Sequence, residues 1–239
     1  MTQPTIVFSL GAWSTPAVFD AVRSRLHSLG FDSECAARPS VDAEPPLKTF
    51  EDDVASLRSV LTRLAEEGKD IIVVAHSYGG MVASSAVEGL GPAKGDRGKV
   101  VKVIYLAAFA LDKGQSLLGL LDGNLLPWMK LEGDYVYTDN TTIWHDLPAA
   151  EQETWAAKAR GTSRLVFSGE NAYEPWRDIG IPCAYIICEQ DLALPPPLQE
   201  MLAEKVAGPE RTFRLPGGHC PFLTIPDHLT GLLVDIIEA

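Results

Sequence analysis

Three residues of this sequence could together catalyse nucleophilic attack on a carbonyl group: Ser77, Asp191 and His219. Each follows a short apolar run, at residues 70–75, 182–188 and 211–215 respectively. A serine hydroxyl is a weak nucleophile until a histidine removes its proton, and an acidic side chain commonly orients that histidine. The residue types therefore predict a Ser-Asp-His catalytic triad.

The sequence around Ser77 predicts a tight turn from a strand into a helix. Small residues stand two positions before and after it, at Ala75 and Gly79, and a helix of small residues follows. Such a turn projects the serine from the edge of a sheet. The N–H of Tyr78 then points to where an oxyanion would form. An ordinary strand-to-helix turn is the alternative interpretation.

The acid and the base each have an alternative. Asp191 is favoured over Glu189 as the acid because it lies further into its loop, although it could instead cap a helix before Pro195. His219 is preceded by two glycines and could be a simple loop histidine. Both residues are expected at the same edge of a sheet as Ser77.

A second oxyanion donor is expected in the loop after the first apolar run. Gly11 allows close approach of the backbone, so the Ala12 N–H is predicted to act together with the Tyr78 N–H. Substrate contacts are predicted for Gly11 and for four aromatic residues, each of which could equally be core or cap packing. These aromatic residues are Trp13, Phe109, Trp128 and Trp144.

Apolar runs bounded by glycine, proline and aspartate predict the strands that must position these residues. They span 5–9, 32–36, 70–75, 100–107, 182–188 and 211–215. Helical spacing separates them, most clearly over 49–67, where Thr49 and Asp52 resemble a capping box. Strands that alternate with helices predict an α/β fold with a mostly parallel sheet of about six strands. The loops after its strands share one edge.

The alternation stops after Ala107, where a long stretch without comparable strand runs holds four of the five tryptophans. The sequence therefore predicts a single domain over residues 1–239, with a small, mainly helical cap inserted at 112–178 after the fourth strand. A helix over about 148–160 and turns at Gly114, Gly123 and Gly133 are expected inside this cap.

Composition excludes several classes of function. The chain carries 32 acidic and 20 basic side chains, a formal charge of -12, which opposes binding to nucleic acid or to an anionic membrane. No apolar run reaches the roughly 20 residues of a membrane helix, and no basic leader precedes the first strand, so a cytoplasmic location is expected. The four cysteines form no CxxC pair, which predicts buried thiols and neither a metal site nor a cofactor. A homodimer is left open.

Over nearly its full length the chain resembles the α/β-hydrolase superfamily, in which the triad has the chain order Ser, Asp, His. Its motifs are most similar to those of the plant methylesterase and hydroxynitrile lyase group and its fungal and bacterial relatives. They are Gly11-Ala12-Trp13, His76-Ser77-Tyr78-Gly79-Gly80, Asp191 followed by Pro195, and Gly218-His219. The chain departs from the group's pattern at Leu10, where histidine is usual, and at Ala75, where glycine is usual. The resemblance implies that the lyases carry a threonine at position 11 and a lysine after the catalytic histidine, whereas here Gly11 and Cys220 occupy these positions.

These observations predict a serine hydrolase that cleaves a carboxylic ester, a lactone or a thioester of a small, largely apolar molecule through an acyl-enzyme on Ser77. Two alternatives stay open. The same triad could serve a lyase, a carbon–carbon hydrolase or a cyclase, and a ligand-binding receptor could retain a vestigial triad.

Overall fold

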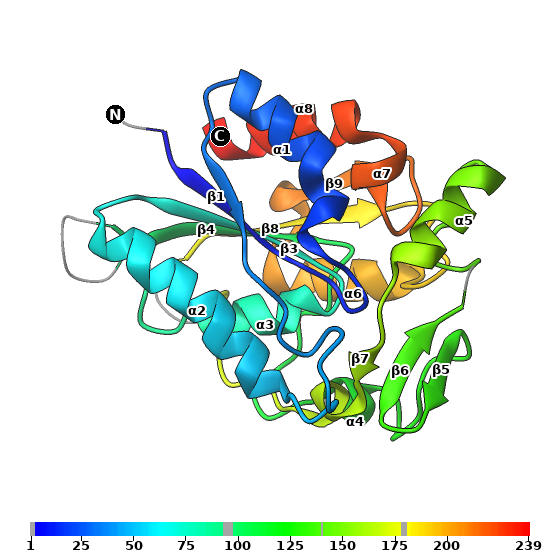
Figure 1. Ribbon diagram of the computed structural model, residues 1–239. Coiled ribbons are helices and arrows are strands. Elements are labelled where there is room, and N and C mark those ends of the chain that lie inside the picture. Colours follow the sequence, from blue (N-terminus) through cyan, green and yellow to red (C-terminus); the bar gives the residue numbers. More distant parts are fainter. Residues whose placement is uncertain (1–2, 93–97, 140, 178–180) are drawn as a thin grey trace.

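The central element of the protein is a six-stranded sheet, seen in a computed structural model that describes residues 3–92, 98–139, 141–177 and 181–239 (Figure 1). Its strands are β1 (Thr5–Ser9), β2 (Ser33–Cys35), β3 (Ile71–His76), β4 (Val100–Leu106), β8 (Cys183–Cys188) and β9 (Thr212–Leu215). They lie in the order β2-β1-β3-β4-β8-β9, and every neighbouring pair is parallel. The predicted parallel sheet is therefore confirmed.

The strand order reverses beside β1, which pairs with β2 on one side and with β3 on the other. Parallel sheets of this kind bind ligands in the crevice at the carboxyl ends of the strands where the order reverses. The loop after β1 and the turn after β3 both lie at this crevice, and these are the segments that hold Ala12 and Ser77.

Both faces of the sheet are covered, so its strands alternate between two cores. In β3, Ile71, Val73 and Ala75 belong to one core, and Ile72 and Val74 belong to the other. The first core is covered by α2 (Phe50–Glu66), α3 (Gly79–Ala86) and α6 (Pro196–Val206). The second is covered by α1 (Asp20–Ser28) and α8 (Pro226–Glu238), which lie side by side on the opposite face (Figure 1). Apolar side chains are needed on both faces, which explains why the strands read as continuous apolar runs.

Short helical segments complete the main domain: η1 (Pro16–Phe19), η3 (Pro209–Arg211) and α7 (Pro221–Thr224). The long helix α2 begins after Thr49, whose N–H donates to the Asp52 carboxylate at 2.9 Å, as one half of the predicted capping box. None of the described helices is both long and apolar enough to cross a membrane.

The segment between β4 and β8, called the insert below, contains more than the helices expected of it. Its described elements are α4 (Leu117–Leu120), β5 (Met129–Glu132), β6 (Tyr135–Thr138), α5 (Ala149–Lys158), β7 (Thr162–Ser163) and η2 (Arg164–Ser168). The predicted helix is α5, and Gly114, Gly123 and Gly133 have positive φ of 81°, 79° and 61°, as their turns require. The predicted end of the cap at residue 178 lies outside the described residues.

A three-stranded antiparallel sheet, β5-β6-β7, is an addition that the sequence did not predict beside the helices of the cap. In β5 only Met129 is buried and the remaining three residues are exposed, so its four-residue alternation of apolar and polar types does not correspond to a buried face. This small sheet is joined to the loop after β1. The indole N–H of Trp13 donates to the Val136 carbonyl at 2.7 Å, and the Trp13 backbone N–H donates to the Thr162 hydroxyl at 2.9 Å.

Candidate active site

Ser77 occupies a strained turn between β3 and α3. Its φ is +54°, a region that non-glycine residues rarely adopt. The turn is held by two N–H groups that donate to the Ser77 carbonyl, from Gly80 at 3.0 Å and from Phe109 at 3.1 Å. A Cβ at Gly79 would lie 2.3 Å from the Ser9 carbonyl oxygen, so only glycine fits there. The local structure is thus the serine turn that the sequence predicts.

His219 and Asp191 form a buried pair at the ends of β9 and β8. The two atoms that join them, His219 Nδ1 and an Asp191 carboxylate oxygen, are 2.7 Å apart, and the side chains are 4% and 0% exposed. The rival carboxylate of Glu189 is exposed to solvent. Because Nδ1 is engaged with Asp191, Nε2 is the ring nitrogen left to exchange a proton with another group.

Both oxygens of the Asp191 carboxylate accept two hydrogen bonds each. One oxygen accepts from the backbone N–H groups of Ala193 at 2.8 Å and Leu194 at 2.9 Å. The other accepts from His219 and, at 3.1 Å, from the side-chain amide of Gln199. Gln199 is fully buried and also bonds to both backbone groups of Cys188, so it fixes the loop that carries Asp191. Sequence reasoning did not identify Gln199.

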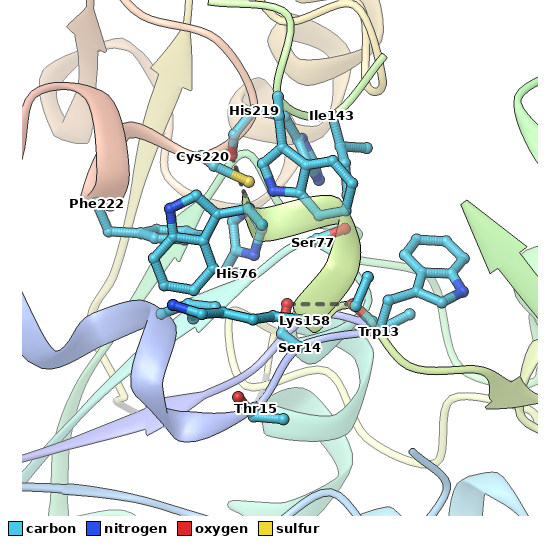
Figure 2. A pocket seen from close by; sticks show the side chains of 15 residues that line it. Trp13, Ser14, Thr15, His76, Ser77, Ile143, Lys158, His219, Cys220 and Phe222 are labelled. Carbon is cyan, nitrogen blue, oxygen red and sulfur yellow. Dashed lines mark hydrogen bonds between the residues drawn. The ribbon is translucent and has the colours of Figure 1, made fainter. Parts of the chain in front are cut away.

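Ser77 and His219 line a single cavity at the edge of the sheet (Figure 2). Its empty space is about 470 Å³, counted to include the part that opens to solvent. The walls combine three predicted site residues, Ala12, Trp13 and Trp144, with residues that sequence reasoning had not placed in the site. These include Ser14, Thr15, Val18, Ile143, Trp155, Lys158, Ala159 and Phe222.

Two predicted wall residues lie elsewhere, which corrects the prediction. Phe109 is 4% exposed and packs in the core on the α3 side of the sheet, away from the cavity wall. Trp128 packs edge-on against Trp13 with ring centres 5.4 Å apart, so it contacts a wall residue without lining the cavity itself. Conversely, Trp155 and Lys158 were missed, although their spacing along α5 places them on the same helix face.

Gly11 lies directly against the site without forming part of the cavity wall. A Cβ at this position would be 2.9 Å from His76 Nδ1 and 3.2 Å from Ser77 Cβ. The loop after β1 therefore approaches Ser77 as closely as a glycine allows. Within the described chain, neither the Ala12 N–H nor the Tyr78 N–H has a protein acceptor, and Ala12 lines the cavity beside Ser77.

A buried ion pair connects the segments that carry these two N–H groups. The Arg38 guanidinium donates to the Leu10 carbonyl and lies 5.2 Å from the centre of the Tyr78 ring. Asp53, 4.0 Å from Arg38, accepts a hydrogen bond from the Tyr78 hydroxyl at 2.9 Å. Burial and the Asp53 carboxylate both raise the pKa of Tyr78. The pair thus fixes Leu10 and Tyr78 relative to one another, a role that the sequence did not reveal.

Two further contacts hold the loop around His219. The buried His76 ring donates from Nε2 to the His219 carbonyl at 2.8 Å, and burial, together with the charge of His219, lowers the pKa of His76 well below its usual value. The Asp146 carboxylate accepts the Gly218 N–H at 2.7 Å. His76 therefore stays neutral and acts as a donor to the backbone beside the His219–Asp191 pair.

Cys220 lines the cavity immediately after His219. Burial first, and then the charges of Asp191 and Asp146, raise the pKa of this thiol well above its usual value, which keeps it neutral. All four cysteines are free thiols.

Comparisons with known proteins identify the family of this chain. Residues 6–228 match the Alpha/beta hydrolase family. The chain belongs to that family. The alpha/beta hydrolase nvfD of Aspergillus novofumigatus is 30% identical over 236 residues, which cover 95% of this chain and 94% of the relative. A putative chloroplastic methylesterase of Arabidopsis thaliana is 27% identical over 208 residues, which cover 77% of this chain and 50% of that protein. This α/β hydrolase is accordingly related to the plant methylesterases.

A solved structure shows the same fold. Polyneuridine aldehyde esterase superimposes on this α/β hydrolase with a TM-score of 0.80 over 98% of this chain and 99% of the other, at 18% sequence identity.

Proposed function

We propose that this α/β hydrolase is a serine esterase that cleaves a carboxylic ester of a small, largely apolar molecule through an acyl-enzyme on Ser77. The observation that carries the proposal is that His219, bonded to the buried Asp191 at 2.7 Å, lines one cavity with a serine held at positive φ. The family and the esterase names of its relatives support cleavage of an ester.

The proposed reaction begins when His219 Nε2 takes the Ser77 hydroxyl proton as Oγ attacks the ester carbonyl carbon. The carbonyl oxygen becomes an oxyanion that accepts hydrogen bonds from the Ala12 and Tyr78 N–H groups. As the C–O bond breaks, His219 returns the proton to the departing alkoxide, which leaves as an alcohol. His219 then deprotonates a water molecule that attacks the acyl-enzyme, and the acid is released with Ser77 restored. Asp191 holds the ring and stabilises its transient positive charge.

The cavity wall favours an apolar substrate body. Trp13, Trp144, Ile143 and Phe222 present aromatic and aliphatic surface beside Ser77. Such surface gives binding energy without fixing the chemical identity of the acyl group, so several small esters should be accepted at different rates.

Cyanohydrin cleavage with the same triad is less consistent with these residues than ester hydrolysis. In the lyases that the chain resembles, a lysine directly after the catalytic histidine stabilises the departing cyanide, and in this chain that position holds the buried, neutral thiol of Cys220. Ester hydrolysis without cyanide release from mandelonitrile is the expected result. Ser77-dependent cyanide release in the absence of esterase activity would overturn the proposal.

The decisive experiment combines covalent labelling with a panel of p-nitrophenyl and methyl esters. A fluorophosphonate should label wild-type protein stoichiometrically on the peptide that contains Ser77, and Ser77→Ala should lose both the label and at least about a thousandfold in kcat. Ser59→Ala, which changes an exposed serine on α2, is the matched control and should retain both. A Ser77→Ala protein with half of the wild-type rate would show that another residue is the nucleophile. Tight binding of small ligands with neither labelling nor turnover would identify a receptor.

A further inference from the structure

The cavity contains a cation that the proposed reaction does not use. Lys158, the last residue of α5, lines the same cavity as Ser77 and His219. Figure 2 shows its side chain lying along the cavity, with the ammonium nitrogen at the end away from Trp13. Trp155 and Ala159, its neighbours on the same face of the helix, also line the wall.

The Lys158 ammonium has no carboxylate partner among the residues that the structure describes. In the described part of the chain, no acidic oxygen lies within 4.0 Å of it, and its recorded contact is with the Trp155 ring, 4.3 Å from the ring centre. The protein carries a formal charge of -12, so its surface offers an exposed lysine many acidic side chains with which to form an ion pair. The Lys158 ammonium instead lies over the Trp155 ring in the cavity wall, where its charge can interact with a bound molecule.

Capping of the helix end does not account for Lys158. A lysine in the last turn of a helix commonly interacts with the unpaired carbonyl groups there. In α5 that role is taken by Arg160, which donates to the carbonyl groups of Ala157, Lys158 and Ala159 at 3.1, 3.1 and 3.2 Å. The ammonium of Lys158 is therefore available to a ligand.

A hydroxyl group on the opposite segment could assist the lysine. Thr15, in the loop after β1, lines the cavity, and its hydroxyl has no hydrogen-bond partner among the described residues. The neighbouring Ser14 hydroxyl is already engaged, since it donates to the Ala12 carbonyl at 3.2 Å. A cation and a free hydroxyl beside aromatic walls form a site for an anionic group attached to an apolar chain.

We propose that the substrate carries a carboxylate at the end of its acyl chain remote from the ester, and that Lys158 binds this carboxylate. The inference rests on the proposed esterase function. We place the carboxylate on the acyl group and not on the alcohol, because the acyl group stays attached to Ser77 through both steps of the reaction. The cavity walls must therefore hold the acyl group. Half-esters of dicarboxylic acids with an apolar chain are the matching chemical class.

The test uses monomethyl glutarate, adipate and suberate, each paired with the methyl ester of the straight-chain monocarboxylic acid of equal length. The readout is the ratio of kcat/KM for the charged ester to that for its neutral partner. Wild-type protein should prefer the charged ester at one chain length or more, and Lys158→Met should lower that ratio about twofold to fivefold. Added sodium chloride should lower the ratio in wild type and have little effect in Lys158→Met.

Lys69→Met is the matched control, because it removes the same charge from an exposed lysine. Lys69 lies two residues before β3, at the opposite edge of the sheet from the cavity. Its ratio should equal that of wild type. A wild-type ratio below one at every chain length, or an equal ratio in wild type and Lys158→Met, would overturn the inference while the esterase proposal stands. Failure of every ester, charged or neutral, would instead overturn the proposed function.

Discussion

Replacing Gly11 with alanine adds one methyl group between the loop after β1 and the end of β3. The new Cβ would lie 2.9 Å from His76 Nδ1 and 3.2 Å from Ser77 Cβ, both closer than ordinary van der Waals contact. Gly11 is not among the residues with positive φ, so alanine can adopt its backbone conformation. Any effect of the substitution is therefore steric.

Neither neighbour can move away without disturbing the site. His76 is held by its 2.8 Å hydrogen bond to the His219 carbonyl and by edge-on packing against Phe222, with ring centres 4.9 Å apart. Overpacking of this kind costs about 1–3 kcal/mol of stability. A displacement of about 1 Å at reacting groups can cost about a hundredfold in rate, so a shift of several tenths of an ångström should lower kcat/KM about tenfold to a hundredfold.

The assay measures kcat/KM on a small aryl ester, together with the free energy of unfolding in urea. Gly231→Ala is the matched control, since it makes the same chemical change on α8, where a Cβ would meet no atom within 4 Å. That variant should keep the wild-type rate and gain about 0.5–1 kcal/mol of stability, because alanine favours the helix.

Wild-type activity in Gly11→Ala would refute the placement of this loop against Ser77 and His76. A comparable loss of rate in Gly231→Ala would show that the assay responds to glycine replacement in general. Either result would remove the steric argument.

Three other contacts give separate predictions. Asp146→Ala removes the acceptor of the Gly218 N–H and should lower kcat about tenfold. Asp146→Asn keeps an oxygen acceptor and should keep most of the rate. Equal values of kcat in these two variants would count against the contact. Tyr78→Phe removes a donor to the buried Asp53, so urea titration should show a loss of about 1–3 kcal/mol, and an unchanged midpoint would contradict the network. Because burial lowers the pKa of His76, the unfolded chain binds a proton below about pH 6.5 that the folded chain excludes, and stability falls there by up to about 1.4 kcal/mol per pH unit. His76→Gln should therefore show a shallower fall in unfolding free energy between about pH 7 and pH 5, and equal slopes would mean that the folded protein protonates His76.

The sequence alone was sufficient for the sheet and for the serine turn. Strands buried on both faces must be apolar throughout, so β3 could be located within one residue at either end. The turn at Ser77 also has a local cause, since a side chain at Gly79 would collide with the Ser9 carbonyl. Ser77, Asp191 and His219 could be grouped because parallel strands connected by helices end at one edge of the sheet.

The sequence was a weaker guide to the insert and to the cavity wall. The hairpin of β5 and β6 is short, and its two strands have four residues each, the lower limit of length at which an alternation of apolar and polar residues indicates a strand. Aromatic residues are equally suited to a core and to a pocket. Whether Phe109 or Trp155 faces the substrate was therefore decided by how the insert packs on the sheet.

Only the tertiary structure revealed the polar residues that support the site. Arg38 reaches the Leu10 carbonyl across 28 positions of sequence, and Asp146 reaches the Gly218 N–H across 72. The pattern of apolar residues in a sequence indicates which residues are buried, and glycine, proline and similar residues indicate where the chain turns. A hydrogen bond depends instead on atoms that come within about 3 Å after folding, and a long separation along the chain leaves no pattern from which that approach could be predicted.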